Sequence, residues 1–216
     1  MTENPPPIIV LPNNIAVREH RLSDSEAIAH HGNNRKLWMN LRDHWPLPYT
    51  TQAAEEYIKS IPLDPTNFQP TGPGVGTGAS IVWEGPKVST KYVITHEGAA
   101  IGVIGLNFNE DVKRRAAELG YWLGEEYWGK QITTMVVKAF VEWSFRTFEQ
   151  LLRLEAFVFA WNLASIRVLQ KAGFEYEGTQ KCGAWKDGCC VDMVFYGRLR
   201  ENIRDLVGLP QKGMAL

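Results

Sequence analysis

One stretch decides the fold of this chain: ELGYWLGEEYWGKQI, residues 118–132. An extended apolar segment ends near Leu123, a short polar loop follows, and a long helix begins at Ile132. The first backbone amides of a helix have no partner within it, and the helix dipole favours an anion there. Gly129 in the loop lets the backbone approach such an anion closely. The junction therefore predicts a site for a phosphate or pyrophosphate group.

Residues 124–131, GEEYWGKQ, also come close to the nucleotide-binding pattern G-x-x-x-x-G-K-S/T. The last residue of that pattern supplies a hydroxyl ligand to Mg²⁺, and an amide at Gln131 replaces it poorly. Tyr127 and Trp128 are also too bulky for a loop that wraps closely about phosphate. We therefore do not expect a nucleoside triphosphatase.

Composition sets the class of protein. The chain has 216 residues, 44% of them hydrophobic, and its 23 basic and 24 acidic residues give a net charge of -1. This balance argues against a nucleic-acid-binding protein that depends on phosphate contacts. No stretch approaches the ~20 apolar residues that span a bilayer, and the first residues lack the basic start and apolar core of a signal peptide. We expect a cytoplasmic protein that binds neither nucleic acid nor membrane.

Cysteine usage agrees with that location. Cys182, Cys189 and Cys190 form no CxxC pair, so we expect reduced thiols and no zinc site. The chain divides into a mobile N-terminal arm (1–12), a single domain (13–207) and a C-terminal tail (208–216). A Gly/Pro-rich insertion occupies residues 62–89, with a short strand near Ile81–Trp83. Pro73 interrupts the glycine run of this insertion, which excludes a dinucleotide-binding loop.

Apolar periodicity predicts the remaining elements. Strands are expected at Ile15–Arg18, Tyr92–Thr95, Ala100–Leu106, Ala117–Leu123, Leu154–Phe159 and Cys190–Leu199, with the last hairpin turning over Gly183–Gly188. Helices are expected from a capping box at Ser23 and Glu26, over Thr51–Ile61, from Ile132 beyond Trp143, and from Asn162 to Ala172 with Gly173 as its C-terminal cap. The fold class is α/β (α+β), with a mixed, mostly antiparallel sheet flanked by helices.

Four short motifs follow one another along the chain: ELGYWL at 118–123, YWGK at 127–130, NLAS at 162–165 and KAGF at 171–174. WPLPYT at 45–50 precedes the second helix. In this order and spacing the chain resembles the GNAT family of acetyl-CoA-dependent N-acetyltransferases, RimJ/RimL-like branch, from about Ile15 to Leu199. The resemblance implies two parallel strands, Glu118–Leu123 and Arg153–Phe159, that splay apart around the pantetheine arm of the coenzyme.

The same resemblance implies the coenzyme-binding residues: Tyr121, Trp122, Leu123, Trp128, Gly129, Lys130, Gln131, Ile132, Thr133 and Asn162. The pyrophosphate loop departs from the family pattern Q/R-x-x-G-x-G/A at two positions. Glu126 is acidic where the pattern has a basic or amide residue, and Gln131 replaces a small residue. These departures put the affinity for the coenzyme in question.

Acyl transfer to an amine needs a base, and Glu118 is the first choice because it lies on the strand that would hold the thioester. A structural hydrogen bond is the alternative role. Many family members have at position 169 a tyrosine that acts as the acid for the departing thiolate, and this chain has Leu169 there. Ser165 is therefore expected to donate to the thiolate instead, and a serine without a catalytic role is the alternative.

The walls of the acceptor pocket are expected to be Trp38, His44, Trp45, Tyr49 and Trp185. His30, His31 and His44 lack a carboxylate at fixed spacing, so no metal is expected.

The function expected from the resemblance is transfer of an acetyl group from acetyl-CoA to a primary amine by direct attack within a ternary complex. The acceptor is either a small amine or a protein N-terminus. A non-catalytic acyl-CoA-binding module of the same fold is the alternative, motivated by Gln131 and Leu169. The partners are thus acetyl-CoA and an amine, and a homodimer is left open.

Overall fold

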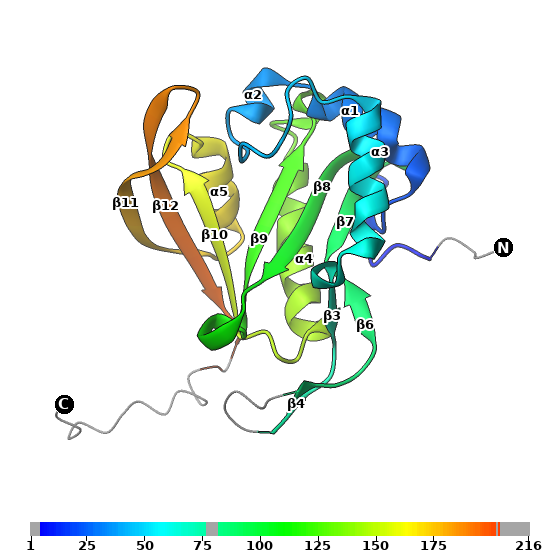
Figure 1. The fold of residues 1–216 in the computed structure, drawn as a ribbon, viewed down its shortest axis with the longest axis vertical. Helices are drawn as coiled ribbons and strands as arrows, with labels where there is room; N and C mark the ends of the chain where they lie inside the picture. Colours follow the sequence, from blue (N-terminus) through cyan, green and yellow to red (C-terminus); the bar gives the residue numbers. More distant parts are fainter. Residues whose placement is uncertain (1–4, 77–81, 202, 204–216) are drawn as a thin grey trace.

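The computed structural model describes residues 5–76, 82–201 and 203. The predicted C-terminal tail, the first four residues of the arm and residues 77–81 of the insertion, Ile81 included, lie outside this range. Within the described residues, eight strands form one sheet in the order β1-β2-β7-β8-β9-β10-β12-β11 (Figure 1). Their bounds are β1 Ile9–Leu11, β2 Ile15–Arg18, β7 Lys91–His96, β8 Ala99–Phe108, β9 Ala116–Leu123, β10 Arg153–Phe159, β11 Glu175–Lys186 and β12 Cys189–Leu199.

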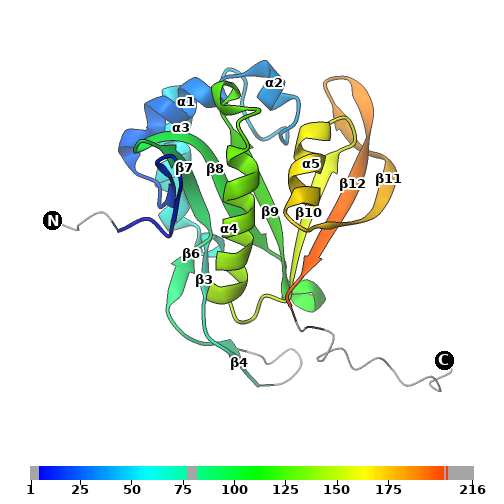
Figure 2. The same ribbon diagram turned by 180° about the vertical axis from the view of Figure 1, so that it is seen from behind.

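Helices cover both faces of this sheet. α1 (Ser25–Gly32) and α3 (Thr51–Ser60) lie on one face, with the short α2 (Arg35–Trp38) at its upper edge (Figure 1). α4 (Ile132–Thr147) and α5 (Leu163–Lys171) lie on the other face (Figure 2). No described helix has both the length and the apolar character that crossing a membrane requires. The predicted mixed α/β architecture is therefore confirmed.

The predicted apolar stripe of the long helix forms the main core. Val136, Val137, Phe140 and Val141 of α4 are completely buried against the sheet. A second, smaller core lies under α1 and α3 and includes Trp122 of β9. Burial of large apolar side chains on both faces of a strand is typical of a sheet with helices on each side, as predicted for β10. These two cores fix β9 between the helical layers.

The site depends on how β9 and β10 pair. They are the one parallel pair among the described strands of the sheet, and they pair only from Ala116, opposite Arg153, to Glu118, opposite Glu155. Beyond Glu118 the strands diverge, as Figure 1 shows. β9 continues on β8 up to Leu123, and β10 continues on β12 up to Phe159. The predicted splay is thus present, and one edge of each strand is open to a ligand.

The N-terminal region corrects two predictions. Ile9–Leu11, assigned to a mobile arm, forms β1 and pairs with β2. Ser23 does not cap the first helix, which begins at Ser25 after a single tight turn. Asp24 organises that turn: its buried carboxylate accepts hydrogen bonds of 2.8 and 2.7 Å from Arg18. A paired buried carboxylate competes with simple end-capping, which is why the capping pattern misled.

The insertion and the last hairpin also differ from expectation. The insertion contains two small antiparallel pairs, β3 (Phe68–Pro70) with β6 (Lys87–Ser89), and β4 (Gly74–Val75) with β5 (Val82–Trp83). The hairpin turns over Asp187 and Gly188 alone, both with positive φ, as a two-residue Asp-Gly turn requires. The extended strands bring Cys182 and Cys190 together in a disulfide, so the prediction of three reduced thiols is wrong; Cys189 is a free, exposed thiol.

Candidate active site

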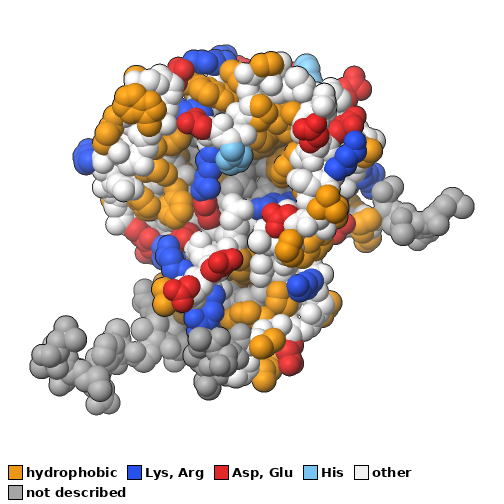
Figure 3. Space-filling view, in the orientation of Figure 1, with side chains coloured by type: hydrophobic (Ala, Val, Ile, Leu, Met, Phe, Trp, Pro, Cys, Tyr) orange, Lys and Arg blue, Asp and Glu red, His pale blue; other side chains and the backbone are white. Residues whose placement is uncertain are grey.

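Two cavities meet where β9 and β10 diverge. The larger cavity, about 860 Å³, extends under α3 and the loop after α2. The smaller cavity, about 370 Å³, extends to the N-terminus of α4 and along α5. Six residues line both: Asn40, Leu41, Tyr121, Trp122, Asn162 and Ser165. On the face that Figure 3 shows, cationic, acidic and histidine side chains surround a hollow in the upper half of the molecule. The two cavities therefore adjoin at the gap between β9 and β10.

The smaller cavity contains the predicted anion site. Gly129 and Gln131 adopt left-handed backbone conformations, with φ of 74° and 62°, immediately before α4. No side chain caps this helix, and its first residues, Ile132 to Thr134, line the cavity. The first amides of a helix are unpaired within it and attract an anion. This geometry can seat a pyrophosphate.

Two cations of α5 add to this site. Arg167 and Lys171, one turn apart, line the smaller cavity with the helix N-terminus opposite. Neither residue was predicted to bind the coenzyme. Their i, i+4 spacing on the helix that follows Asn162 places both side chains on one face, and this could have indicated them. Lys130 was predicted to bind the coenzyme, but it is not among the described residues that line either cavity. Its ammonium lies 5.4 Å from the Tyr127 ring centroid.

The other predicted coenzyme residues lie along the gap between the splayed strands. Tyr121, Trp122, Leu123, Trp128 and Thr133 all line the smaller cavity. The Leu123 carbonyl accepts a 2.6 Å hydrogen bond from the indole N–H of Trp128. That carbonyl was expected to be available to pantetheine, so a coenzyme that used it would have to share it with the indole.

Asn162 and Ser165 form the opposite wall. Asn162 caps α5, as predicted, because its Oδ1 accepts a 3.1 Å hydrogen bond from the backbone N–H of Ser165. The Ser165 hydroxyl lies 2.8 Å from the Tyr121 hydroxyl, so a hydrogen bond joins the two sides of the gap. Both hydroxyls line the point where the cavities meet.

Alternation along β9 places the predicted base and this hydroxyl pair on opposite faces of the sheet. Side chains three positions apart in a strand point to opposite faces. Tyr121 packs against the core under α4, whereas Glu118 and Trp122 face the layer of α1 and α3. The larger cavity thus holds the carboxylate, and the hydroxyl pair faces the space below α4 and α5.

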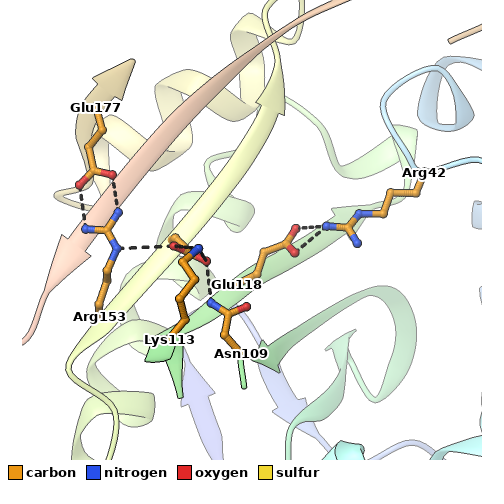
Figure 4. Close-up of polar contacts among 7 residues, drawn as sticks. Arg42, Asn109, Lys113, Glu118, Arg153 and Glu177 are labelled. Carbon is orange, nitrogen blue, oxygen red and sulfur yellow. Dashed lines mark hydrogen bonds and ion pairs between the residues drawn. The ribbon is translucent and has the colours of Figure 1, made fainter. Parts of the chain in front are cut away.

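Glu118 sits at the last paired position before the splay. Its side chain is 16% exposed, and both carboxylate oxygens accept 2.5 Å hydrogen bonds from Arg42 (Figure 4). Its partner across the parallel pair, Glu155, is buried and accepts from Asn109 and Lys113 at 2.7 and 3.2 Å. Two adjacent carboxylates therefore each have their own cation, and only the one at Glu118 faces the larger cavity.

Three of the five predicted acceptor residues line the larger cavity: His44, Trp45 and Tyr49. Trp45 stacks on Tyr49 with ring centroids 4.2 Å apart, which makes a rigid aromatic wall. Trp38 and Trp185 are absent from the described lining of both cavities. Trp185 is 67% exposed on the hairpin.

Trp38 has another environment. The Lys186 ammonium lies 3.5 Å from its ring centroid and 2.8 Å from Asp43. The hairpin therefore holds the loop after α2 in place without lining the pocket.

Most of the chain matches a known protein family. The family model of the acetyltransferase (GNAT) domain matches residues 14–175, about three quarters of the length of this chain. The chain belongs to the GNAT acetyltransferase family. Against curated proteins, it is 32% identical over 109 residues to the putative ribosomal N-acetyltransferase YdaF of Bacillus subtilis (strain 168), a match that covers 50% of this chain and 58% of that protein. The chain thus spans little more than half of this relative.

Solved structures show the same fold. A RimL ribosomal L7/L12 α-N-protein acetyltransferase in complex with coenzyme A superposes with a TM-score of 0.69 at 20% identity, over 90% of this chain and 98% of the other. Mycobacterium smegmatis RimJ, also solved with a coenzyme A derivative, gives a TM-score of 0.69 at 19% identity, over 89% and 85% of the two chains. At these identities the similarity shows the GNAT fold alone.

Three further charged residues line the larger cavity of this GNAT domain, and no sequence motif marks them. They are Glu56, Asp64 and Lys91, which lie there with Glu118. The Lys91 ammonium donates a 2.8 Å hydrogen bond to the Leu106 carbonyl and another to Asn107. Burial lowers the pKa of Lys91 to about 8, although Glu118 and Asp64 oppose the shift. No motif marks Lys91, since its placement depends on the pairing of β7 with β8.

The fold brings a carboxylate beside two of the histidines, because Glu126 lies 3.2 Å from His30. His30, His31 and Glu126 have possible ligand atoms within 4.8 Å of one another on the surface beside the loop before α4. The spacing of these residues in the sequence does not show this cluster, in which His30 and Glu126 are largely exposed.

Proposed function

We propose that this protein transfers an acetyl group from acetyl-CoA to a primary amine by direct attack within a ternary complex. The observation that carries the proposal is the meeting of two cavities at the β9–β10 splay: the N-terminus of α4, which no side chain caps, lies in one, and the Glu118 carboxylate lies in the other. A donor and an acceptor that enter from opposite faces of the sheet would meet at this junction.

The smaller cavity suits coenzyme A. The amides at the start of α4, with Arg167 and Lys171, would hold its phosphates. The open edge of β9 beyond Glu118 would accept the amide groups of pantetheine in place of a neighbouring strand. The GNAT membership of the chain supports this assignment.

The larger cavity suits the amine. A lysine-like amine with a pKa of about 10.4 is mostly protonated near neutral pH and must lose a proton before it attacks. Glu118 faces this cavity and would take that proton, directly or through a water molecule. A backbone amide near Leu123 would stabilise the oxyanion, and Ser165 would face the departing sulfur. The acceptor is a small amine or a protein N-terminus.

A non-catalytic acyl-CoA-binding role is the second candidate. It is favoured by Gln131 in the pyrophosphate loop and by the hydrogen bonds that occupy both oxygens of Glu118. Calorimetric titration with acetyl-CoA, followed by a thiol-release assay with a panel of small amines and peptides, separates the two. Binding with amine-dependent thiol release supports the enzyme. Binding without release by any amine supports the second candidate, and no binding at millimolar acetyl-CoA contradicts both.

A further inference from the structure

The hydrogen bond between Tyr121 and Ser165 crosses the gap that the splayed strands leave. Tyr121 projects from β9 and Ser165 from the first turn of α5, and their hydroxyl oxygens are 2.8 Å apart. Both residues line the junction of the two cavities. The Tyr121 hydroxyl also lies 3.4 Å from the Ser165 carbonyl, so it is directed at this turn of the helix.

α5 itself brings no aromatic hydroxyl to this junction. Leu169, one turn after Ser165, lines the larger cavity and is completely buried. Within the described part of the junction, Tyr121 supplies the aromatic hydroxyl from the opposite wall. We infer that Tyr121 is a positioning residue for acetyl transfer. Its hydroxyl donates a hydrogen bond to Ser165 Oγ and thereby directs the Ser165 hydroxyl proton at the departing sulfur. This inference rests on the function proposed above.

Hydroxyl chemistry explains the division of roles. A serine hydroxyl has one proton and two acceptor sites, so it accepts from Tyr121 and donates to sulfur at the same time. A phenol is a strong donor, and burial raises the pKa of Tyr121 above its usual value. Tyr121 therefore keeps its proton near neutral pH and can act as a hydrogen-bond donor. It polarises Ser165.

The balance of the step follows. Glu118 takes one proton from the ammonium, and the neutral nitrogen then forms a bond to the acetyl carbon. The carbon–sulfur bond breaks with its electron pair going to sulfur, and the second proton on nitrogen passes to water. A thiol with a pKa near 8.5 leaves tolerably as a thiolate. Ser165 holds this thiolate by a hydrogen bond, and water supplies the proton that converts it to free coenzyme A.

The test measures the pKa of the coenzyme A thiol in the complex and does not require turnover. Coenzyme A is bound to the full-length protein, and the thiolate fraction is followed by its absorbance as the pH is varied. The inference predicts a bound thiol pKa below that of free coenzyme A. In Tyr121→Phe and in Ser165→Ala the thiolate fraction at a given pH should fall about tenfold, which is one pKa unit. Ser165→Ala keeps the helix cap, because that bond uses the backbone N–H.

The double variant decides whether Tyr121 acts through Ser165. Combined, the two substitutions should lower the thiolate fraction no further than Ser165→Ala alone, whereas independent effects would multiply. With an active amine, kcat should fall about 10- to 100-fold in each variant while the Kd of acetyl-CoA stays unchanged. Tyr92→Phe is the control, since it removes a buried hydroxyl that donates to the Ser89 carbonyl, and Tyr92 is not among the described residues that line either cavity.

The outcomes separate this inference from the proposed function. An unchanged thiol pKa and kcat in Tyr121→Phe, in a protein that binds and acetylates, overturns the inference and leaves the function intact. A lowered thiol pKa that rises in Tyr121→Phe supports the inference even where no acceptor has been found. Loss of coenzyme A binding and melting temperature together in Tyr121→Phe, but not in Tyr92→Phe, shows a structural role and overturns it.

Discussion

Arg42 donates to both carboxylate oxygens of Glu118 at 2.5 Å, at the point where β9 leaves β10. The two residues come from different layers: Glu118 from the sheet, and Arg42 from the loop after α2. The Arg42 side chain is 59% exposed, whereas that of Glu118 is 16% exposed. The proposed base therefore faces the larger cavity with a largely exposed cation beside it. Each carboxylate oxygen has two acceptor sites, so one remains for an amine proton.

Replacing Arg42 tests what this cation does to a charged acceptor. We expect Arg42→Met to lower the KM of a cationic amine about threefold, because a like charge near a solvated site costs about 0.5–1 kcal/mol. The Kd of acetyl-CoA should not change. Arg146→Met, on the exposed side of α4, is the matched control. A rise in KM would show that Arg42 instead anchors the acceptor.

Gln131 tests the departure from the family's pyrophosphate loop. Its φ of 62° is a conformation that glycine adopts more easily than any other residue. Gln131→Gly should therefore keep or tighten acetyl-CoA binding without lowering the melting temperature. Calorimetric titration measures the first and thermal unfolding the second. A loss of affinity beyond tenfold, about 1.4 kcal/mol, would mean that the glutamine side chain makes its own phosphate contact.

Gly129→Asp provides the opposite change in the same loop. Gly129 has a φ of 74°, so a side chain there strains the backbone, and a carboxylate would repel phosphate. We expect the increase in melting temperature that acetyl-CoA gives the parent protein to disappear. An undiminished increase would place the phosphates away from this loop.

Arg167 and Lys171 test the electrostatic part of coenzyme binding. Both line the smaller cavity, so Arg167→Gln and Lys171→Gln should each raise the Kd of acetyl-CoA about 3- to 10-fold, with a weaker dependence on salt. Lys138→Gln makes the same charge change on an exposed part of α4 and should leave the Kd unaltered. Equal effects of all three variants would indicate a general charge effect and no specific contact.

Lys91 gives a pH dependence with a definite sign. Burial lowers its pKa to about 8 from an ordinary 10.5, so between these values the folded protein binds fewer protons than the unfolded chain. Stability then rises with pH across this window, by about 3 kcal/mol in total for one group. We expect Lys91→Met to remove that rise in the free energy of unfolding, measured with denaturant between about pH 8 and 10.5, the two pKa values. Lys87→Met, at an exposed lysine, should retain it.

The sequence predicted most of the fold because its strongest signals are local. The apolar stripe of α4 and the cap at Asn162 each depend on residues close together in the chain. The splay of β9 and β10 was predicted through resemblance to a family. The last hairpin turn was predicted too long, because Ala184, Trp185 and Lys186 continue β11 and pair with β12 up to the Asp187-Gly188 turn.

Much of the site depends on contacts distant in sequence. Arg42 and Glu118 are 76 residues apart, and Tyr121 and Ser165 are 44 apart. Lys91 reaches the larger cavity because β7 pairs with β8, which no motif encodes. Trp38, predicted to line the pocket, packs against the Lys186 ammonium instead. These two residues are nearly 150 positions apart, so no local pattern in the sequence indicates their contact.

Glu118→Gln tests the central claim most directly, with acetyl-CoA affinity and turnover measured on one preparation. A base that acts on the acceptor need not touch the coenzyme, so the Kd of acetyl-CoA should stay unchanged while kcat/KM falls about 10²–10⁴-fold. Glu142→Gln, on the exposed face of α4, should alter neither quantity. Full activity in a well-folded Glu118→Gln protein, or loss of coenzyme binding and melting temperature with turnover per folded molecule intact, would contradict the account.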